Sequence, residues 1–304
     1  MPVIEVNHLT KDYGHGRGVF DVSIKVEKGV CYGFLGPNGA GKTTTIRHLM
    51  GFSKPQTGTT SILGRDSWDN AAELKFEVGY LPGEIAFPKG LTGTKFLKMQ
   101  MKMRKVTDDI YLKELLKRFE LDPSMSVDKM SLGVRRKLAV VTAFIHDPDI
   151  LILDEPTSGL DPVMQQNFID FVLAEKKRGK TILLSSHIFH EVDATCDRIS
   201  IIKDGRIASD FVADDLKNRS SKIYRVTFGD KISFDKFTSL DYTFHSKNEK
   251  KLRARVVIET SDINQLIADI ADLNLADFQE IPFTLEDYFM SFYKNDRVFE
   301  EVRK

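Results

Sequence analysis

Short apolar runs separated by polar turns predict a mixed α/β fold for most of this chain. Residues 22–26 alternate apolar and polar side chains, which is typical of a half-buried strand. Residues 30–35 and 150–153 are continuous apolar runs and indicate strands buried on both faces, as in a parallel sheet. Residues 112–119 carry apolar side chains at helical spacing, and the whole stretch 90–147 is predicted to be helical.

A polar stretch at residues 214–222 interrupts this pattern, and the pattern then restarts. Residues 224–228 and 252–258 again alternate like strands, and an apolar helical stripe follows them. We therefore expect an α/β domain over residues 1–213, a linker over 214–222 and a small accessory α+β domain over 223–304.

Composition limits where this chain works and what it binds. The 304 residues include 44 basic and 44 acidic side chains, and this balance disfavours nucleic acid as a partner. The two cysteines, Cys31 and Cys196, are far apart in sequence and indicate a reducing compartment. We find no apolar window long enough to span a membrane and no signal-peptide pattern, so the prediction is a cytoplasmic chain.

One glycine-rich segment predicts nucleotide binding. It follows the buried strand at 30–35, precedes a helix-like stretch, and reads Gly36-Pro37-Asn38-Gly39-Ala40-Gly41-Lys42-Thr43-Thr44. Backbone N–H groups of such a loop, with the start of the following helix, surround phosphate oxygens. In this P-loop pattern Lys42 is expected to reach the β- and γ-phosphates of ATP, and the Thr43 hydroxyl to bind Mg²⁺.

Two adjacent acids complete the predicted catalytic site. Asp154 and Glu155 follow the apolar run 150–153, so they lie at the carboxyl end of a strand, where open α/β sheets bind ligands. Asp154 is predicted to hold Mg²⁺ together with Thr43. Glu155 is predicted to activate the attacking water as a general base.

The segment that follows resembles the ATP-binding subunits of ABC transporters. Residues 154–161 read Asp-Glu-Pro-Thr-Ser-Gly-Leu-Asp, a run highly specific for that family. Ser131-Leu132-Gly133 occupies the family's signature position, and His187 that of its switch histidine. Tyr13 matches the aromatic residue that stacks on adenine. The resemblance covers roughly residues 1–212, which is most of the chain.

The resemblance implies a P-loop NTPase core of ABC type, with a helical subdomain over about residues 90–147 and an antiparallel β subdomain. It also implies a dimer that encloses ATP between the P-loop of one subunit and the signature segment of the other. Ser131 and Gly133 would then contact the γ-phosphate across the dimer. His187 would sense the γ-phosphate, and Asp161 would couple the two sites.

The partners implied are a second ATPase subunit, with a homodimer favoured, and a separate transmembrane permease. The transporter is predicted to be an exporter. The chain would then be peripheral on the inner face of the cell membrane. The alternative is a soluble ABC-type ATPase that acts on ribosomes or DNA. Two roles are considered for the accessory domain. It is either a packing element that adds stability, or an element that braces the dimer or regulates hydrolysis.

Two departures from the family pattern stand out. Leu132 and Val134 replace the first signature glycine and the signature Gln. Gly83 stands where the family has a Gln that contacts Mg²⁺, so that contact is lost or passes to Glu84. The basic residues at 135–137 are predicted to form a solvated helix face.

Overall fold

The computed structural model describes residues 2–217, 221–282, 284–290 and 292, and the chain divides into two compact units. The first unit is Met1–Ala213 and the second is Asp214–Lys304. Each unit has its own hydrophobic core, and each is described by itself below.

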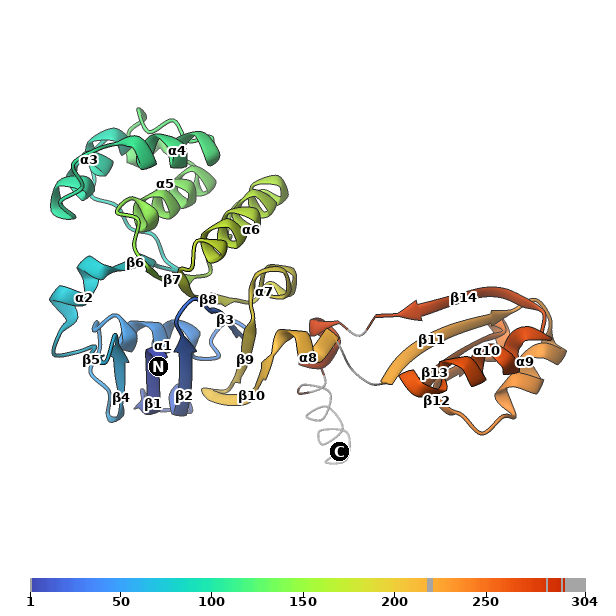
Figure 1. Ribbon diagram of the computed structural model, residues 1–304. Helices are drawn as coiled ribbons and strands as arrows, with labels where there is room; N and C mark the ends of the chain where they lie inside the picture. The colour runs from blue at the N-terminus through green and yellow to red at the C-terminus, as the bar shows by residue number, and fades with distance from the viewer. Residues whose placement is uncertain (1, 218–220, 283, 291, 293–304) are drawn as a thin grey trace. The chain divides into compact units, whose positions relative to one another are not determined.

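A mostly parallel six-stranded sheet forms the centre of the first unit (Figure 1). Its strand order is β10-β9-β3-β8-β7-β6, and only the hairpin partner β10 runs antiparallel to its neighbour. The strands are β3 (Cys31–Leu35), β6 (Val78–Leu81), β7 (Ile150–Asp154), β8 (Thr181–Ser186), β9 (Arg198–Lys203) and β10 (Arg206–Val212). Because β3, β7 and β8 are parallel neighbours, the loops that follow them meet at one edge of the sheet.

A second, antiparallel sheet has the order β2-β1-β4-β5. Its strands are β1 (Pro2–Asp12), β2 (Gly18–Glu27), β4 (Thr57–Ile62) and β5 (Arg65–Asp66). The alternation predicted at residues 22–26 is confirmed, since Val22, Ile24 and Val26 are buried and the residues between them are exposed. These side chains belong to one core with Tyr32 and Phe34 of β3, which packs the two sheets together.

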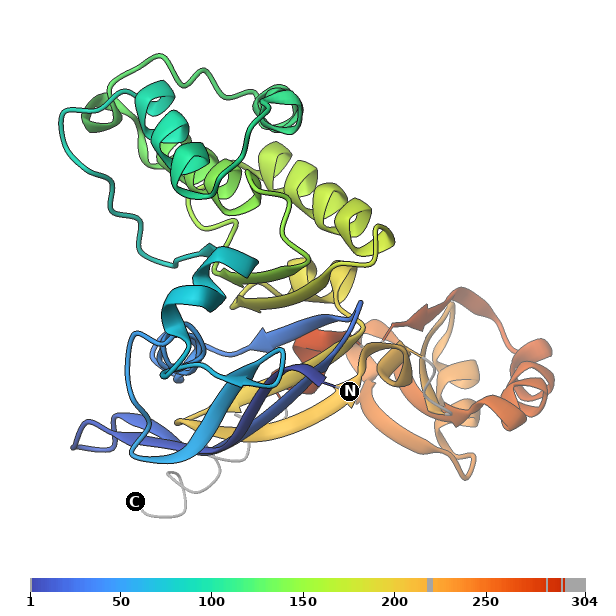
Figure 2. The same cartoon turned by 60° about the vertical axis from the view of Figure 1, so that its left-hand side comes forward.

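The helices of the first unit form two groups. Helices α3, α4 and α5 gather at one end of the unit, away from the antiparallel sheet (Figures 1 and 2). Their bounds, with a short 3-10 helix η1, are α3 (Gly93–Met103), α4 (Ile110–Arg118), η1 (Val127–Lys129) and α5 (Leu132–Phe144). The remaining helices are α1 (Lys42–Leu49), α2 (Ala71–Glu77), α6 (Pro162–Lys177) and α7 (Phe189–Thr195).

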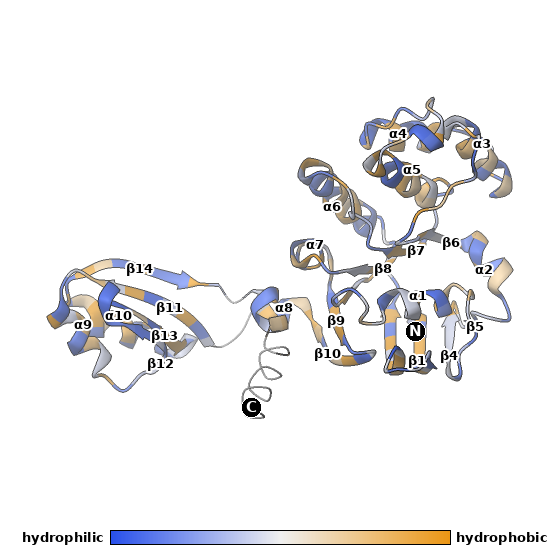
Figure 3. Ribbon diagram, turned by 180° about the vertical axis from the view of Figure 1, so that it is seen from behind, coloured by the Kyte–Doolittle hydropathy of each residue, from blue (hydrophilic) through white to orange (hydrophobic). Residues whose placement is uncertain are grey.

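The second unit has a β-α-β-β-α-β order, which is the ferredoxin-like arrangement. Its sheet order is β12-β13-β11-β14, and all pairs are antiparallel. Hydrophobic and hydrophilic residues are interspersed along β11 (Figure 3), and Tyr224, Val226 and Phe228 are buried in the core. The elements are β11 (Ser221–Phe228), α9 (Lys231–Thr238), β12 (Thr243–Asn248), η2 (Glu249–Lys251), β13 (Arg253–Glu259), η3 (Thr260–Asp262), α10 (Ile263–Ala271) and β14 (Leu275–Ile281).

The segment between the domains differs from the linker expected over residues 214–222. Helix α8 spans Ala213–Lys217, and β11 already begins at Ser221, two residues before the predicted accessory domain. Ala213 and Leu216, which are three positions apart, are both buried. Burial of these two apolar side chains on one helix face favours a helix here, although most of the stretch is polar.

The two cysteines are much closer in space than in sequence. Both are free and buried, and their sulfur atoms lie 3.8 Å apart. Cys31 is in β3 and Cys196 follows α7, which contacts β3. Among the residues that the structure describes, no helix combines the length and the apolar character that crossing a membrane requires.

Candidate active site

The glycine-rich loop follows β3 and leads into α1, as the sequence predicts. Gly41 has φ 113°, and a Cβ atom there would come within 2.7 Å of Val19. A Cβ atom on Gly36 would come within 2.6 Å of the backbone oxygen of Ile202. Both positions therefore exclude larger residues, and the loop can wrap tightly enough to direct its N–H groups inward.

Lys42 is the first residue of α1, and its ammonium group lies inside the loop. Nζ donates hydrogen bonds to the backbone oxygens of Gly36, at 2.6 Å, and Pro37, at 3.1 Å. It also lies 3.0 Å from Oε1 of Glu155. The side chain is only 5% exposed, so its charge is screened little by solvent and acts strongly on a phosphate bound in the loop.

Asp154 ends β7 and is fully buried. The Ser185 hydroxyl on β8 donates to its Oδ1, whereas Oδ2 is buried without a hydrogen-bond donor among the described residues. Burial raises the pKa of Asp154, and the hydroxyls of Ser185 and Thr43 lower it. A carboxylate oxygen that lacks a donor, next to a threonine hydroxyl, is a donor set that Mg²⁺ accepts, so these residues fit the metal.

Glu155 lies between two other predicted site residues, Lys42 and His187. Its Oε2 lies 2.5 Å from Nδ1 of His187, which follows β8, and its Oε1 faces Lys42. Pairing of Asp154 with Ser185 in the sheet brings the ends of β7 and β8 together and so aligns Glu155 with His187. Glu155 has φ 51°, a left-handed conformation that turns the chain sharply after the strand.

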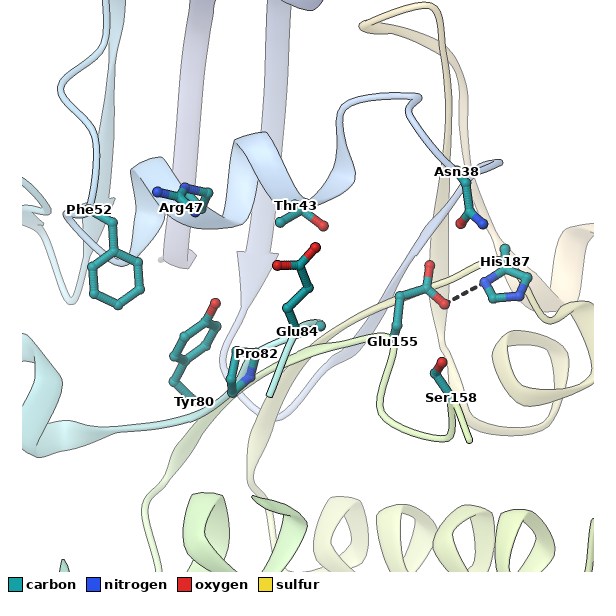
Figure 4. Close-up of a pocket in the computed structure, with 11 residues that line it drawn as sticks. Asn38, Thr43, Arg47, Phe52, Tyr80, Pro82, Glu84, Glu155, Ser158 and His187 are labelled. Atoms are coloured by element: carbon teal, nitrogen blue, oxygen red, sulfur yellow. Dashed lines mark hydrogen bonds and ion pairs between the residues drawn. The ribbon is translucent and has the colours of Figure 1, made fainter. Parts of the chain in front are cut away.

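Glu155, His187 and part of the P-loop segment line a cavity of about 800 Å³ (Figure 4). The P-loop and catalytic segments contribute Asn38, Thr43, Glu155, Ser158 and His187 to its wall. A second part of the wall comes from α1, the turn after it, strand β6 and the loop after β6, and consists of Arg47, Phe52, Tyr80, Pro82, Gly83 and Glu84. In Figure 4 the Glu84 carboxylate is directed to the Thr43 hydroxyl across this cavity.

Comparison with known proteins agrees with this geometry. The sequence profile described as "ABC transporter" matches residues 19–158. The bacitracin transport ATP-binding protein BcrA of Bacillus licheniformis is 32% identical over 95% of this chain and 96% of that protein. The Nod factor export ATP-binding protein I of Burkholderia lata is 35% identical over 68% of this chain and 70% of that protein.

This chain belongs to the ABC transporter family. A solved structure of the ATP-binding subunit of an ABC transporter is 30% identical, with a TM-score of 0.65, over 71% of this chain and 92% of that one. A dimeric ATP-binding cassette bound to ADP and phosphate has the same fold, with a TM-score of 0.62 at 20% identity, over 69% of this chain. The protein is thus the ATP-hydrolysing subunit of an ABC transporter, with a P-loop NTPase core.

The ABC signature segment lies outside the cavity. Ser131 caps α5, because its Oγ accepts a hydrogen bond from the Val134 N–H at 3.3 Å. Asp161 caps α6 in the same way, through a 2.9 Å bond from the Met164 N–H. A Cβ atom on Gly133 would lie 3.1 Å from the oxygen of Gly159, so the signature segment and the segment before Asp161 are in contact.

Tyr13 also lies apart from the cavity of this ABC ATPase. It follows β1, and 54% of the residue is exposed. The Lys11 ammonium lies 5.6 Å from the centre of its ring. An exposed aromatic ring of this kind is available to a planar base, but the structure does not bring it next to the catalytic residues.

Two features of the ABC ATPase were missed by sequence reasoning. The expected solvated face at 135–137 is wrong for Arg136, which is only 3% exposed. The cavity residues Phe52 and Tyr80, whose ring centres lie 5.7 Å apart, were not foreseen. Arg47 had a usable signal, because it lies one helical turn after Thr43 and so shares its face of α1.

Proposed function

We propose that this ATPase drives an exporter by closing with a second ATPase subunit around two ATP molecules. The observation that carries the proposal is the placement of Glu155 between Lys42 and His187 at the end of β7. This arrangement puts one carboxylate beside a phosphate-binding cation and beside a histidine that can hold it in place. The name of the Nod factor export relative supports export rather than uptake.

Each residue of the P-loop site then has a distinct role. The loop from Gly36 to Thr44 binds the phosphates through its N–H groups, and Lys42 neutralises their charge. Thr43 and Asp154 hold Mg²⁺, which when bound lowers the charge on the β- and γ-phosphates. Tyr13 stacks on the adenine ring.

Hydrolysis needs a base on the open side of the γ-phosphate. Glu155 accepts a proton from water as the water oxygen attacks the γ-phosphorus, and the bond to the leaving ADP oxygen breaks. His187 donates a hydrogen bond from Nδ1 to Oε2 of Glu155 and so fixes the direction in which Glu155 points.

The signature segment acts on the other subunit. Ser131 and Gly133 contact the γ-phosphate of the partner's ATP, with the start of α5 directed at that charge. Asp161 lies beside the same segment and couples the two sites. A homodimer is favoured because the chain carries both a complete P-loop site and a signature segment with Ser131 and Gly133.

The membrane partner is a separate permease, which places the chain on the inner face of the cell membrane. The test is to purify the tagged chain from detergent-solubilised membranes of its native host and to identify what copurifies by mass spectrometry. A polytopic membrane protein in stoichiometric amount is expected, and it is expected to be absent when the tag alone is the bait. Recovery of only ribosomal or chromosomal proteins would overturn the transport function and favour the soluble alternative.

A further inference from the structure

Arg136 is a buried cation on the helix that begins at the signature segment. It lies in α5, little more than one turn after the capping residue Ser131, and is 3% exposed. A buried guanidinium group requires acceptors for its N–H groups, because an unpaired buried charge is strongly destabilising.

Its acceptors are three backbone oxygens on two different loops. Nε donates to the oxygen of Ser158 at 3.0 Å. Nη1 donates to Pro82 at 3.1 Å, and Nη2 donates to Gly83 at 2.8 Å. Because all three acceptors are main-chain atoms, Arg136 holds the path of the two loops and not the side chains on them.

Both loops adjoin the predicted catalytic acids. Ser158 belongs to the β7 loop, defined here as residues 155–161, which begins with Glu155. Gly83 belongs to the β6 loop, residues 82–84. A Cβ atom on Gly83 would lie 3.1 Å from Oδ2 of Asp154, so the β6 loop lies against that carboxylate.

The electrostatic surroundings keep Arg136 charged. Burial lowers the pKa of its guanidinium, while the carboxylates of Asp154, Glu155 and Glu191 raise it. These three acids come from β7, the β7 loop and α7, so the arginine provides positive charge where the sheet edge collects negative charge.

The neighbouring Arg135 also donates hydrogen bonds to backbone oxygens, but it does not contact the β6 or β7 loop through them. Its Nε donates to the oxygen of Val127 at 3.2 Å, and its Nη2 donates to Asp128 at 3.1 Å. Both acceptors lie in η1, which belongs to the helical group with α3, α4 and α5. Arg135 therefore stabilises the helical group internally, whereas Arg136 connects that group to the parallel sheet.

We propose that Arg136 is a positioning residue that ties the start of α5 to the loops carrying Glu155 and Gly83. A movement of the helical group is then transmitted to Glu155. The position of the signature segment therefore determines whether the Glu155 carboxylate is aligned with the attacking water. The inference rests on the proposed function, because it assumes that Ser131 acts at the ATP of a second subunit.

Four variants of the full chain test this role: Arg136→Lys, Arg136→Met, Arg135→Lys and Arg135→Met. The measurements are ATPase kcat and KM, ADP affinity, and amide hydrogen exchange across the chain. Lysine keeps the charge, but its compact ammonium group cannot reproduce a planar fork that bonds to three separated oxygens.

For both Arg136 variants we expect kcat to fall about 100-fold, as a displacement of about 1 Å of a catalytic group does. ADP affinity should stay within about twofold of the wild-type value, because Arg136 donates to neither the P-loop nor Tyr13, the groups proposed to bind ADP. Amide exchange should accelerate in the β6 and β7 loops. The Arg135 variants should leave kcat and the exchange of both loops unchanged.

Wild-type kcat and loop exchange in Arg136→Lys would overturn the inference, since charge alone would then suffice. Equal losses of kcat in the Arg135 and Arg136 variants would also overturn the inference. If Arg136→Met no longer binds ADP and is therefore misfolded, Arg136→Lys decides. An inactive wild-type chain would count against the proposed function, while the comparison of loop exchange would still judge Arg136.

Discussion

Nδ1 of His187 lies 2.5 Å from Oε2 of Glu155, although the two residues are 32 positions apart in the chain. The contact exists because β7 and β8 are neighbours in the parallel sheet and end together. Each side chain alone is an ordinary polar residue after a strand. Together with Lys42, they form the cluster in which we propose that a water molecule is deprotonated beside a phosphate.

Replacing Glu155 by Gln should retain ATP binding and abolish turnover, because the amide cannot accept the proton from water. The expected loss of kcat is about 10²- to 10⁴-fold. ATP should then accumulate the closed dimer, which light scattering after size exclusion would detect as a doubled mass. The exposed Glu73→Gln on α2 is the matched control, and it should turn over ATP normally. Multiple turnovers by the Glu155 variant would remove Glu155 from the role of base.

Replacing Lys42 by Ala should weaken ATP binding by about 100-fold or more, since a buried charge-assisted contact to phosphate is lost. Equilibrium titration with a fluorescent ATP analogue measures the affinity. Lys177→Ala, at an exposed position in the last turn of α6, is the control and should bind normally. Unchanged affinity in the Lys42 variant would contradict the P-loop assignment.

Glu191 should make the folded state less stable as the pH rises. Burial raises its pKa from 4.5 to about 7. Its contribution to stability is therefore complete below about pH 4.5 and is lost progressively as the pH rises to about 7. Glu191→Gln removes this loss, because the amide has no charge to bury.

The measurement is the free energy of unfolding at pH 5 and pH 8 for both proteins. Between these values the wild type should lose on the order of 2–3 kcal/mol more than Glu191→Gln. Parallel pH dependence in the two proteins would show that Glu191 is already ionised in the folded state at pH 5.

Phe237 tests the core of the second unit. It is fully buried on α9, and its ring centre lies 5.3 Å from that of Phe228 and 5.6 Å from that of Phe244. Phe237→Ala should destabilise this unit by about 3–5 kcal/mol. Ile232→Ala, on the same helix but 82% exposed, should have little effect.

The single tryptophan, Trp68, lies in the first unit and separates the two unfolding events. In Phe237→Ala, circular dichroism should show an unfolding transition at lower temperature than in the wild type. The Trp68 fluorescence transition and the ADP affinity should stay as in the wild type. An equal shift of the Trp68 transition would mean that the two units unfold as one.

Local features of the fold and site were predictable from sequence. The P-loop, the strand that ends at Asp154 and the alternation at 22–26 each depend on neighbours in the chain, so their residue patterns carry the information. The family resemblance added His187 as a candidate site residue, and the structure places it in contact with Glu155.

What sequence could not supply were contacts set by tertiary packing. Arg136 looked like a surface residue because it lies between two other basic residues, and its acceptors Pro82 and Gly83 are more than fifty positions away. The approach of Cys31 to Cys196 depends on how α7 packs on β3. Helix α8 was missed because five residues are too few for periodicity to outweigh a polar composition.

The sheet order of the second unit has a consequence for how it is joined to the rest of the chain. Ile223, near the start of its first strand, pairs with Ile281, at the end of its last strand. The polypeptide therefore enters and leaves the sheet of this unit at neighbouring points. A module with adjacent ends can be excised, exchanged or inserted elsewhere without rerouting the chain around it.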